Sequence, residues 1–103
     1  MKFKLLVGTA LILSCLQVQA RTMDAIQQSG TLKVGVPGDY APLAYRNASG
    51  ALEGYDIDMA NALGKSLNLK VDFVITSWPT LSDDLAADKF DVAMGGVTET
   101  AKR

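Results

Sequence analysis

The sequence contains no histidine, one cysteine and one tryptophan among its 103 residues. The absence of histidine excludes a Ser-His-Asp or Cys-His nucleophile system and a histidine-bearing zinc site. One cysteine forms neither a disulfide within the chain nor a four-thiolate metal cluster. Neither sign of charge dominates, since 10 Lys and Arg stand against 11 Asp and Glu. Such a balance gives no broad positive field for a nucleic acid, and none is expected as a partner.

Glycine patterns that hold cofactors are also missing. No Walker-type phosphate loop or dinucleotide glycine fingerprint follows a predicted strand, so we expect no cofactor. Two acidic pairs, Asp56 with Asp58 and Asp83 with Asp84, are spaced like metal ligands or paired acids. Both pairs fall in first-turn or exposed positions of expected helices. We therefore interpret them as solvated helix charges and expect no metal site.

The first twenty residues have the pattern of a secretory signal peptide. Lys2 and Lys4 give a basic start, residues 5–16 form a mostly apolar run without charge, and the small residue Ala20 ends a V-x-A cleavage pattern. The apolar run is too short to span a bilayer, which takes about 20 residues. The sequence therefore predicts export to a bacterial periplasm with cleavage after Ala20.

A lipid-anchored form is the alternative. Residues 11–15 end in Cys15 and loosely resemble a lipoprotein box, but the bulky Leu13 does not suit that cleavage, so we favour the soluble form. The mature chain, residues 21–103, then has eight basic and eleven acidic residues and no cysteine. A chain without cysteine suits an oxidising compartment.

Hydrophobic periodicity in the mature chain predicts alternating strands and helices. The expected elements are a helix at 21–30, strands at 32–36, 71–75 and 91–94, hairpin arms at 43–46 and 51–54, and helices that begin at Asp56 and Pro79. Strands separated by helices imply a parallel sheet with right-handed crossovers. The residues expected to face the core include Ile57, Ala60, Leu63, Leu67, Val71, Phe73, Ile75, Leu81, Leu85 and Ala86.

In such sheets a ligand binds beyond the carboxyl ends of the strands. This rule selects three loops, at residues 37–42, 76–79 and 95–103. In the first loop, Tyr40 can cover a small ligand with its ring beside Asp39. In the second, Pro79 fixes the backbone after Ser77 and Trp78. The alternatives remain that Asp39 and Tyr40 form an ordinary turn and that Trp78 is part of the core.

The third loop combines groups that suit a carboxylate. Gly95 and Gly96 allow close approach of the backbone and expose N–H groups, Thr98 adds a hydroxyl, and Arg103 adds a guanidinium that grips two oxygens in parallel. The alternative is a solvated arginine. The pattern predicts a small carboxylate ligand.

Three stretches, TLKVGVPGDYAPLAY, GALEGYDIDMANALGKSLNLKVDFV and KFDVAMGGVTETAKR, resemble the N-terminal part of the family 3 bacterial extracellular solute-binding proteins. The resemblance runs from about residue 32 to residue 103. It implies an α/β fold of the type II periplasmic-binding-protein class, here a partial first lobe with a mostly parallel sheet flanked by helices. It also implies an amino-acid ligand and an ABC permease as partner.

Within this group, GDYAPLAYR, GYDIDMA and above all TSWPTL resemble the periplasmic cyclohexadienyl dehydratases. Their resemblance implies a carbon–oxygen lyase of phenylalanine biosynthesis acting on prephenate or arogenate. Members of the group have two lobes, and the opposing lobe supplies the acidic proton donor. We therefore expect this chain to be an N-terminal fragment that lacks its C-terminal lobe and is inactive alone.

Carried over by position, the resemblance implies that Tyr40 and Trp78 flank the ligand. Thr98 and Arg103 would hold its carboxylate, and the backbone of Gly95 and Gly96 would line the same wall. Two departures from the family pattern exist: Leu43 stands where Phe is common, and Gly95 stands where Ser is frequent. The second departure removes one possible hydroxyl contact and affects ligand choice. Asp39 and Ser77, whose hydroxyl can donate or accept a hydrogen bond, are further candidates for contact with the ligand.

Overall fold

The computed structural model describes residues 20–101 and residue 103. The predicted signal peptide, apart from Ala20, lies outside the described residues, and so does the predicted alternative anchor Cys15. Within the described part of the chain, no helix is both long enough and apolar enough to cross a membrane.

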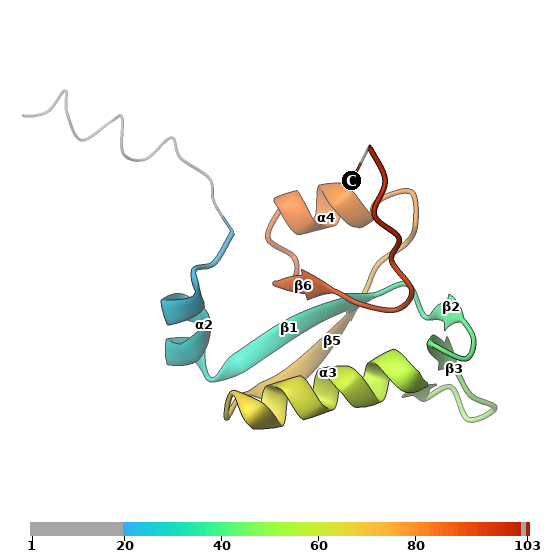
Figure 1. Ribbon diagram of the computed structural model, residues 1–103, viewed down its shortest axis with the longest axis horizontal. Coiled ribbons are helices and arrows are strands. Elements are labelled where there is room, and N and C mark those ends of the chain that lie inside the picture. Colours follow the sequence, from blue (N-terminus) through green and yellow to red (C-terminus); the bar gives the residue numbers. More distant parts are fainter. Residues whose placement is uncertain (1–19, 102) are drawn as a thin grey trace, which may run out of the picture.

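A parallel three-stranded sheet forms the centre of the molecule, as predicted (Figure 1). Its order is β5-β1-β6, and β1 pairs in parallel with both neighbours. A second, antiparallel sheet of order β2-β3-β4 forms the predicted hairpin. The elements along the chain are α2 Met23–Ser29, β1 Thr31–Val36, β2 Asp39–Tyr40, β3 Ala44–Arg46, β4 Leu52–Glu53, α3 Tyr55–Ser66, β5 Lys70–Ile75, α4 Leu81–Ala86 and β6 Val92–Ala93.

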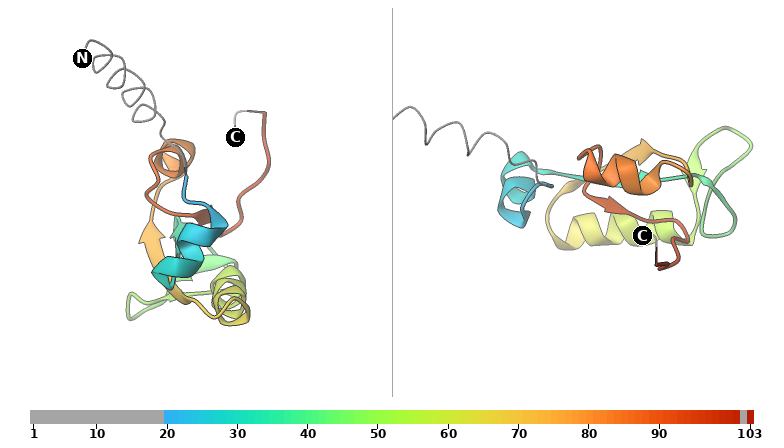
Figure 2. Two further views of the ribbon diagram at one scale, coloured as in Figure 1. Left: turned by 90° about the vertical axis from the view of Figure 1, so that its left-hand side faces the viewer. Right: turned by 90° about the horizontal axis from the view of Figure 1, so that it is seen from above.

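Helices cover both faces of the parallel sheet. Figures 1 and 2 show α3 on one side and α4 on the other, with α2 at the end where β1 begins. The main core includes apolar residues of the central strand β1 and of the face of α3 turned toward it, together with one residue each from α2, from β3 and from the turn before β5. These buried residues are Ile26, Leu32, Val34, Val36, Ala44, Ile57, Ala60 and Leu69.

On the opposite face, Phe90 is completely buried. Its ring lies against Gly35 in the middle of β1, where an added Cβ atom would come within 2.5 Å of the Phe90 Cδ2 atom. The absence of a side chain at position 35 is therefore what admits the aromatic ring to the face of the sheet.

Four residues expected in the core are exposed instead: Leu63, whose exposed fraction is 39%, Ile75 with 50%, Leu85 with 36%, and Ala86. In α3, the contact with β5 is made by Gly64, whose Cα lies so close to Val71 that a Cβ atom would approach Val71 Cγ2 to 2.3 Å. This close approach turns the neighbouring Leu63 outward.

The start of the last helix was also predicted wrongly. Helix α4 begins at Leu81 rather than at Pro79, because the Ser77 hydroxyl accepts a hydrogen bond from the Thr80 N–H at 3.3 Å and extends the preceding turn. The helix therefore has 6 residues and contacts the two-residue strand β6. Leu81 is buried, whereas Leu85 and Ala86 lie at the surface.

The carboxylate of Asp91 joins the beginning of the chain to the sheet. It accepts hydrogen bonds from Arg21 Nε at 2.9 Å and from the Lys33 N–H of β1 at 2.8 Å, and Arg21 Nη2 completes the ion pair. The Asp91 side chain is only 3% exposed. The hydrogen bonds from Arg21 hold the pKa of Asp91 below its ordinary value, and the same contact raises the pKa of Arg21.

Candidate functional site

The loops that follow β1 and β5 meet through two aromatic side chains. The ring centroids of Tyr40 and Trp78 lie 6.3 Å apart, with the ring planes at 66° in an edge-to-face arrangement. The indole Nε1–H of Trp78 also donates a hydrogen bond to Asp39 Oδ1 at 2.8 Å. Tyr40 is 47% exposed, so its ring still offers surface to a ligand.

The loop that follows β6 brings a cation to the same place. The guanidinium carbon of Arg103 lies 5.5 Å from the centroid of the Trp78 ring, within the range of a cation–π interaction. Arg103 Nη1 donates to the backbone oxygen of Thr98 at 3.0 Å, which bends the segment back on itself. Thr98 therefore contacts Arg103 through its carbonyl group, not through the hydroxyl that the sequence pointed to.

Gly95 and Gly96 form the turn between β6 and this segment. Their φ angles of 121° and 86° are in the region that favours glycine. A Cβ atom on Gly96 would lie 2.6 Å from Tyr40 Cδ2, so the turn packs directly against the tyrosine ring.

The predicted exposure of the two glycine N–H groups is wrong. Both donate to one carboxylate oxygen, Asp56 Oδ2, from Gly95 at 3.0 Å and from Gly96 at 2.9 Å. Asp56 comes from the first turn of α3 and is half-buried. It is therefore not the solvated helix charge that the sequence suggested, whereas Asp58, two residues later, is exposed as expected.

Hydroxyl groups fix the loop that carries Trp78. Ser77 Oγ lies 2.6 Å from Thr80 Oγ1, while Thr76 Oγ1 donates to Asp84 Oδ2 at 2.7 Å and Thr80 Oγ1 donates to the same oxygen at 3.0 Å. Lys89 Nζ lies 3.1 Å from Asp84 Oδ1. Ser77 is thus engaged within its own turn.

Asp84 was also expected to be a solvated charge, and that expectation is wrong. Its side chain is 15% exposed. The Thr76 hydroxyl and then Lys89 hold the pKa of Asp84 below its ordinary value.

The predicted site residues thus fall into two groups. The structure joins Asp39, Tyr40, Trp78, Gly96 and Arg103 through direct contacts, which we call the aromatic–arginine cluster. Thr98 meets this cluster through its backbone, Ser77 faces Thr80, and Gly95 is buried next to Ala44. Within the described residues, no group of three His, Cys, Asp or Glu side chains is placed to hold a metal ion.

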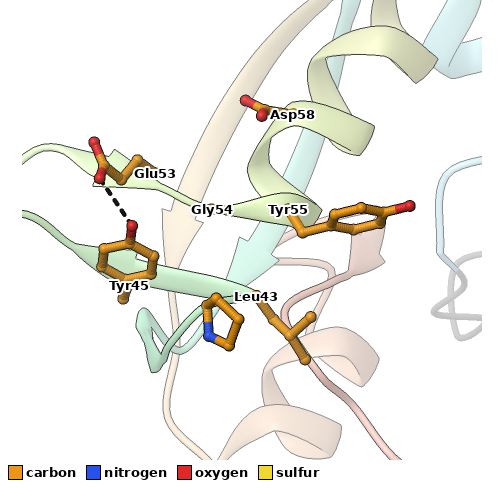
Figure 3. A pocket seen from close by; sticks show the side chains of 7 residues that line it. Leu43, Tyr45, Glu53, Gly54, Tyr55 and Asp58 are labelled. Carbon is orange, nitrogen blue, oxygen red and sulfur yellow. Dashed lines mark hydrogen bonds between the residues drawn. The ribbon is translucent and has the colours of Figure 1, made fainter.

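A surface hollow lies elsewhere, away from these residues. It has a volume of about 570 Å³ and is lined by Pro42, Leu43, Tyr45, Glu53, Gly54, Tyr55 and Asp58, between the β3–β4 hairpin and the start of α3 (Figure 3). Tyr45 donates its hydroxyl to Glu53 Oε1 at 2.9 Å. Hydrogen bonds from Asn47 and Tyr45 lower the pKa of Glu53. None of the predicted site residues lines this hollow.

Sequence reasoning missed Asp56 and Asp84 as residues of the site. The available signal for Asp56 was the Gly-Gly pair, because the N–H groups of two adjacent residues in a turn can converge on one anion. For Asp84, four hydroxyl residues between positions 76 and 82 were the available signal.

The parallel sheet with helices on both faces, and loops gathered at the carboxyl ends of its strands, define a lobe of a type II periplasmic binding protein. The chain belongs to the bacterial extracellular solute-binding proteins, family 3, whose family model matches residues 32–103.

Among known relatives, the cyclohexadienyl dehydratase of Pseudomonas aeruginosa is 46% identical over 88 residues, which cover 85% of this chain and 33% of the relative. The structure of an ancestral cyclohexadienyl dehydratase, AncCDT-3(P188L), has a TM-score of 0.77 and 55% identity, covering 84% of this chain and 36% of that one. An ancestral cationic amino acid solute-binding protein, AncCDT-1, has a TM-score of 0.76 and 43% identity, covering 81% and 36%. This chain therefore spans about a third of these proteins.

Proposed function

We propose that this chain forms one wall of a ligand cleft for a small organic acid, and that the acid is prephenate or arogenate, which the completed protein dehydrates. The single observation that carries this proposal is the aromatic–arginine cluster. In it, the guanidinium of Arg103 lies 5.5 Å from the ring of Trp78, and Tyr40 stands 6.3 Å from the same ring. A carboxylate fits the guanidinium, and a flat six-membered ring fits the two aromatic side chains.

The chemistry divides between binding and proton transfer. Prephenate loses carbon dioxide and its ring hydroxyl group, which departs as water after an acid protonates it, and the product is phenylpyruvate. Arg103 holds a carboxylate, and Tyr40 and Trp78 line the cavity beside the ring. The proton donor belongs to the opposing lobe. Closure of that lobe over the cluster excludes water and strengthens each polar contact.

The identities favour the enzyme over a transport receptor. The chain is 55% identical to the ancestral dehydratase and 43% identical to the ancestral cationic amino acid solute-binding protein.

The second candidate is an amino-acid-binding component of an ABC transporter. The observation that favours it is the similarity to AncCDT-1, which is described as a solute-binding protein for cationic amino acids. In that case the same cluster holds the α-carboxylate of an amino acid, and the partner is a membrane permease.

Binding is measured directly in this chain, because Trp78 is the only tryptophan of the sequence. Titration with prephenate changes the Trp78 emission, and Arg103→Ala weakens the binding by about tenfold, the loss of one charge-assisted carboxylate contact. Arg46→Ala is the matched control, because Arg46 donates to the Gly50 oxygen in the hairpin at 2.7 Å and leaves the cluster untouched.

Turnover separates the two candidates. The remainder of the Pseudomonas aeruginosa dehydratase is joined after Arg103, and the chimera is incubated with prephenate. Formation of phenylpyruvate that Arg103→Ala abolishes supports the dehydratase. A lack of turnover, together with a Trp78 response to L-arginine and none to prephenate, supports the transport receptor. No response to either compound refutes both.

We also propose that the chain is exported and cleaved after Ala20, which leaves a soluble periplasmic protein. The membership in an extracellular family supports this localisation. The mass of the protein recovered from the periplasm of an expressing bacterium tests it, because a lipid-anchored form that begins at Cys15 has a different mass and stays with the membrane.

A further inference from the structure

Asp56 occupies a central place between two of the loops that build the aromatic–arginine cluster. Its backbone N–H donates to the Leu43 carbonyl at 2.8 Å, in the segment that follows Tyr40. Its side chain accepts the N–H groups of Gly95 and Gly96 at 3.0 and 2.9 Å. One residue of α3 therefore fastens the loop after β1 and the loop after β6 to the same point.

The glycine turn depends on this carboxylate. Two successive residues with positive φ angles direct their N–H groups toward one oxygen, which is the arrangement of an anion-binding nest. Here the anion is part of the protein, because the carboxylate comes from the first turn of α3. A ligand carboxylate is consequently directed to Arg103, because the nest is already filled.

The position of the turn is transmitted to the ligand surface through Tyr40. Gly96 leaves so little space that a Cβ atom would lie 2.6 Å from Tyr40 Cδ2 and 3.0 Å from Leu43 Cδ1. A shift of Gly96 therefore moves the tyrosine ring, which in turn contacts Trp78 edge to face.

We propose that Asp56 is a positioning residue of the ligand cleft: it fills the anion nest of the Gly95–Gly96 turn and thereby sets the place of Tyr40 and of the segment that leads to Arg103. This role rests on the proposed function, since it concerns the affinity of the same cluster. Asp56 itself does not touch the ligand.

The test compares Asp56→Asn and Asp56→Ala with Asp58→Asn, a matched control that removes an exposed carboxylate from the same helix turn. Asparagine keeps the shape and one acceptor oxygen but loses the charge that strengthens both hydrogen bonds. Asp56→Asn should weaken prephenate binding, followed by Trp78 emission, by about tenfold, while Asp58→Asn stays within about twofold of the wild type.

Two further readouts separate positioning from general stability. The amide resonances of Gly95 and Gly96 in a ¹H–¹⁵N spectrum should move in Asp56→Asn and stay in place in Asp58→Asn. Formate added to Asp56→Ala should refill the nest and restore both these resonances and the affinity for prephenate. If Asp56→Ala does not fold, Asp56→Asn carries the comparison, because it preserves an acceptor of the same shape.

The outcomes distinguish this inference from the proposed function. Unchanged affinity in Asp56→Asn, or glycine amides that do not move, overturns the positioning role. If the wild-type chain responds to neither prephenate nor L-arginine, the proposed function fails on that result. The positioning role is then judged by the amide resonances of Gly95 and Gly96 and by the Trp78 emission. The role stands if both signals change in Asp56→Asn and if formate restores both signals in Asp56→Ala. The role is refuted if the signals do not behave in this way.

Discussion

Replacement of Asp91 by alanine should destabilise the fold more than any other single loss of a polar group in the described part of the chain. The carboxylate is 3% exposed and accepts three N–H groups, two from Arg21 and one from Lys33 of the central strand. Arg21 is partly exposed and regains water when its partner is removed, whereas the Lys33 N–H, at 2.8 Å from the carboxylate, loses a charge-assisted bond.

The magnitude follows from these contacts. Breaking a buried ion pair costs about 3–5 kcal/mol, and the exposure of Arg21 places this case near the lower end, about 3 kcal/mol. A chain of about 80 ordered residues has a free energy of unfolding of about 4–12 kcal/mol. Asp91→Ala therefore removes a large share of the total. Asp91→Asn, which keeps one acceptor oxygen, should lose about half as much.

Urea unfolding followed by Trp78 emission and far-ultraviolet circular dichroism measures this loss. With a slope of about 1 kcal/mol per molar urea, the midpoint of Asp91→Ala should fall by about 3 M. Asp72→Asn is the control, because Asp72 is an exposed carboxylate on β5. A midpoint shift of Asp91→Ala no larger than that of Asp72→Asn would refute the reasoning.

The dependence on pH gives a second check. The pKa of Asp91 is lowered in the folded chain, mainly by the hydrogen bonds from Arg21. Its stabilising contribution is therefore fully present above the unfolded-state pKa, about 3.9, and is lost as the pH falls through the lower folded-state pKa. The midpoints of the wild type and Asp91→Asn should differ most near neutral pH and converge in acid.

Two other substitutions test the packing and the loop that carries Trp78. Gly64→Ala should lower the free energy of unfolding in urea by about 1–2 kcal/mol, because the added Cβ atom would lie 2.3 Å from Val71 Cγ2 and this overpacking exceeds the gain in helix propensity. A higher free energy of unfolding would contradict the close contact between the helix and the strand. Asp84→Ala should release the hydroxyl of Thr76 and increase acrylamide quenching of Trp78 emission. Asp83→Ala is the control, because Asp83 is exposed. Equal quenching in the two variants would show that the hydrogen bonds of Asp84 do not fix the loop that carries Trp78.

Much of the architecture was predictable from short-range patterns. Alternating apolar residues in 32–36, turn residues after them, and an apolar helix stripe that includes Ile57 and Ala60 predicted the elements and the parallel pairing. The rule for ligand sites in α/β sheets then selected the three loops that meet at the aromatic–arginine cluster. These inferences succeeded because local periodicity and sheet topology together fix which loops lie at one edge.

The same short-range patterns could not predict contacts between segments that are distant in the sequence. The exposure of Leu63 follows from the contact of Gly64 with Val71, and spacing along one helix contains no information about which neighbour lies closer to a strand. The carboxylate of Asp56 reaches glycines about forty positions away, and the hydrogen bonds of Asp84 depend on where α4 begins. Each of these contacts depends on which distant segments the fold brings close together.

The close packing of the Phe90 ring against Gly35 has a consequence for how the sequence varies. The ring occupies the space above the glycine, where a Cβ atom would come within 2.5 Å of it. A larger residue at position 35 is therefore tolerated only when position 90 becomes smaller at the same time. In an alignment of family members, these two positions should co-vary, with small and bulky side chains exchanging places while their combined volume stays nearly constant.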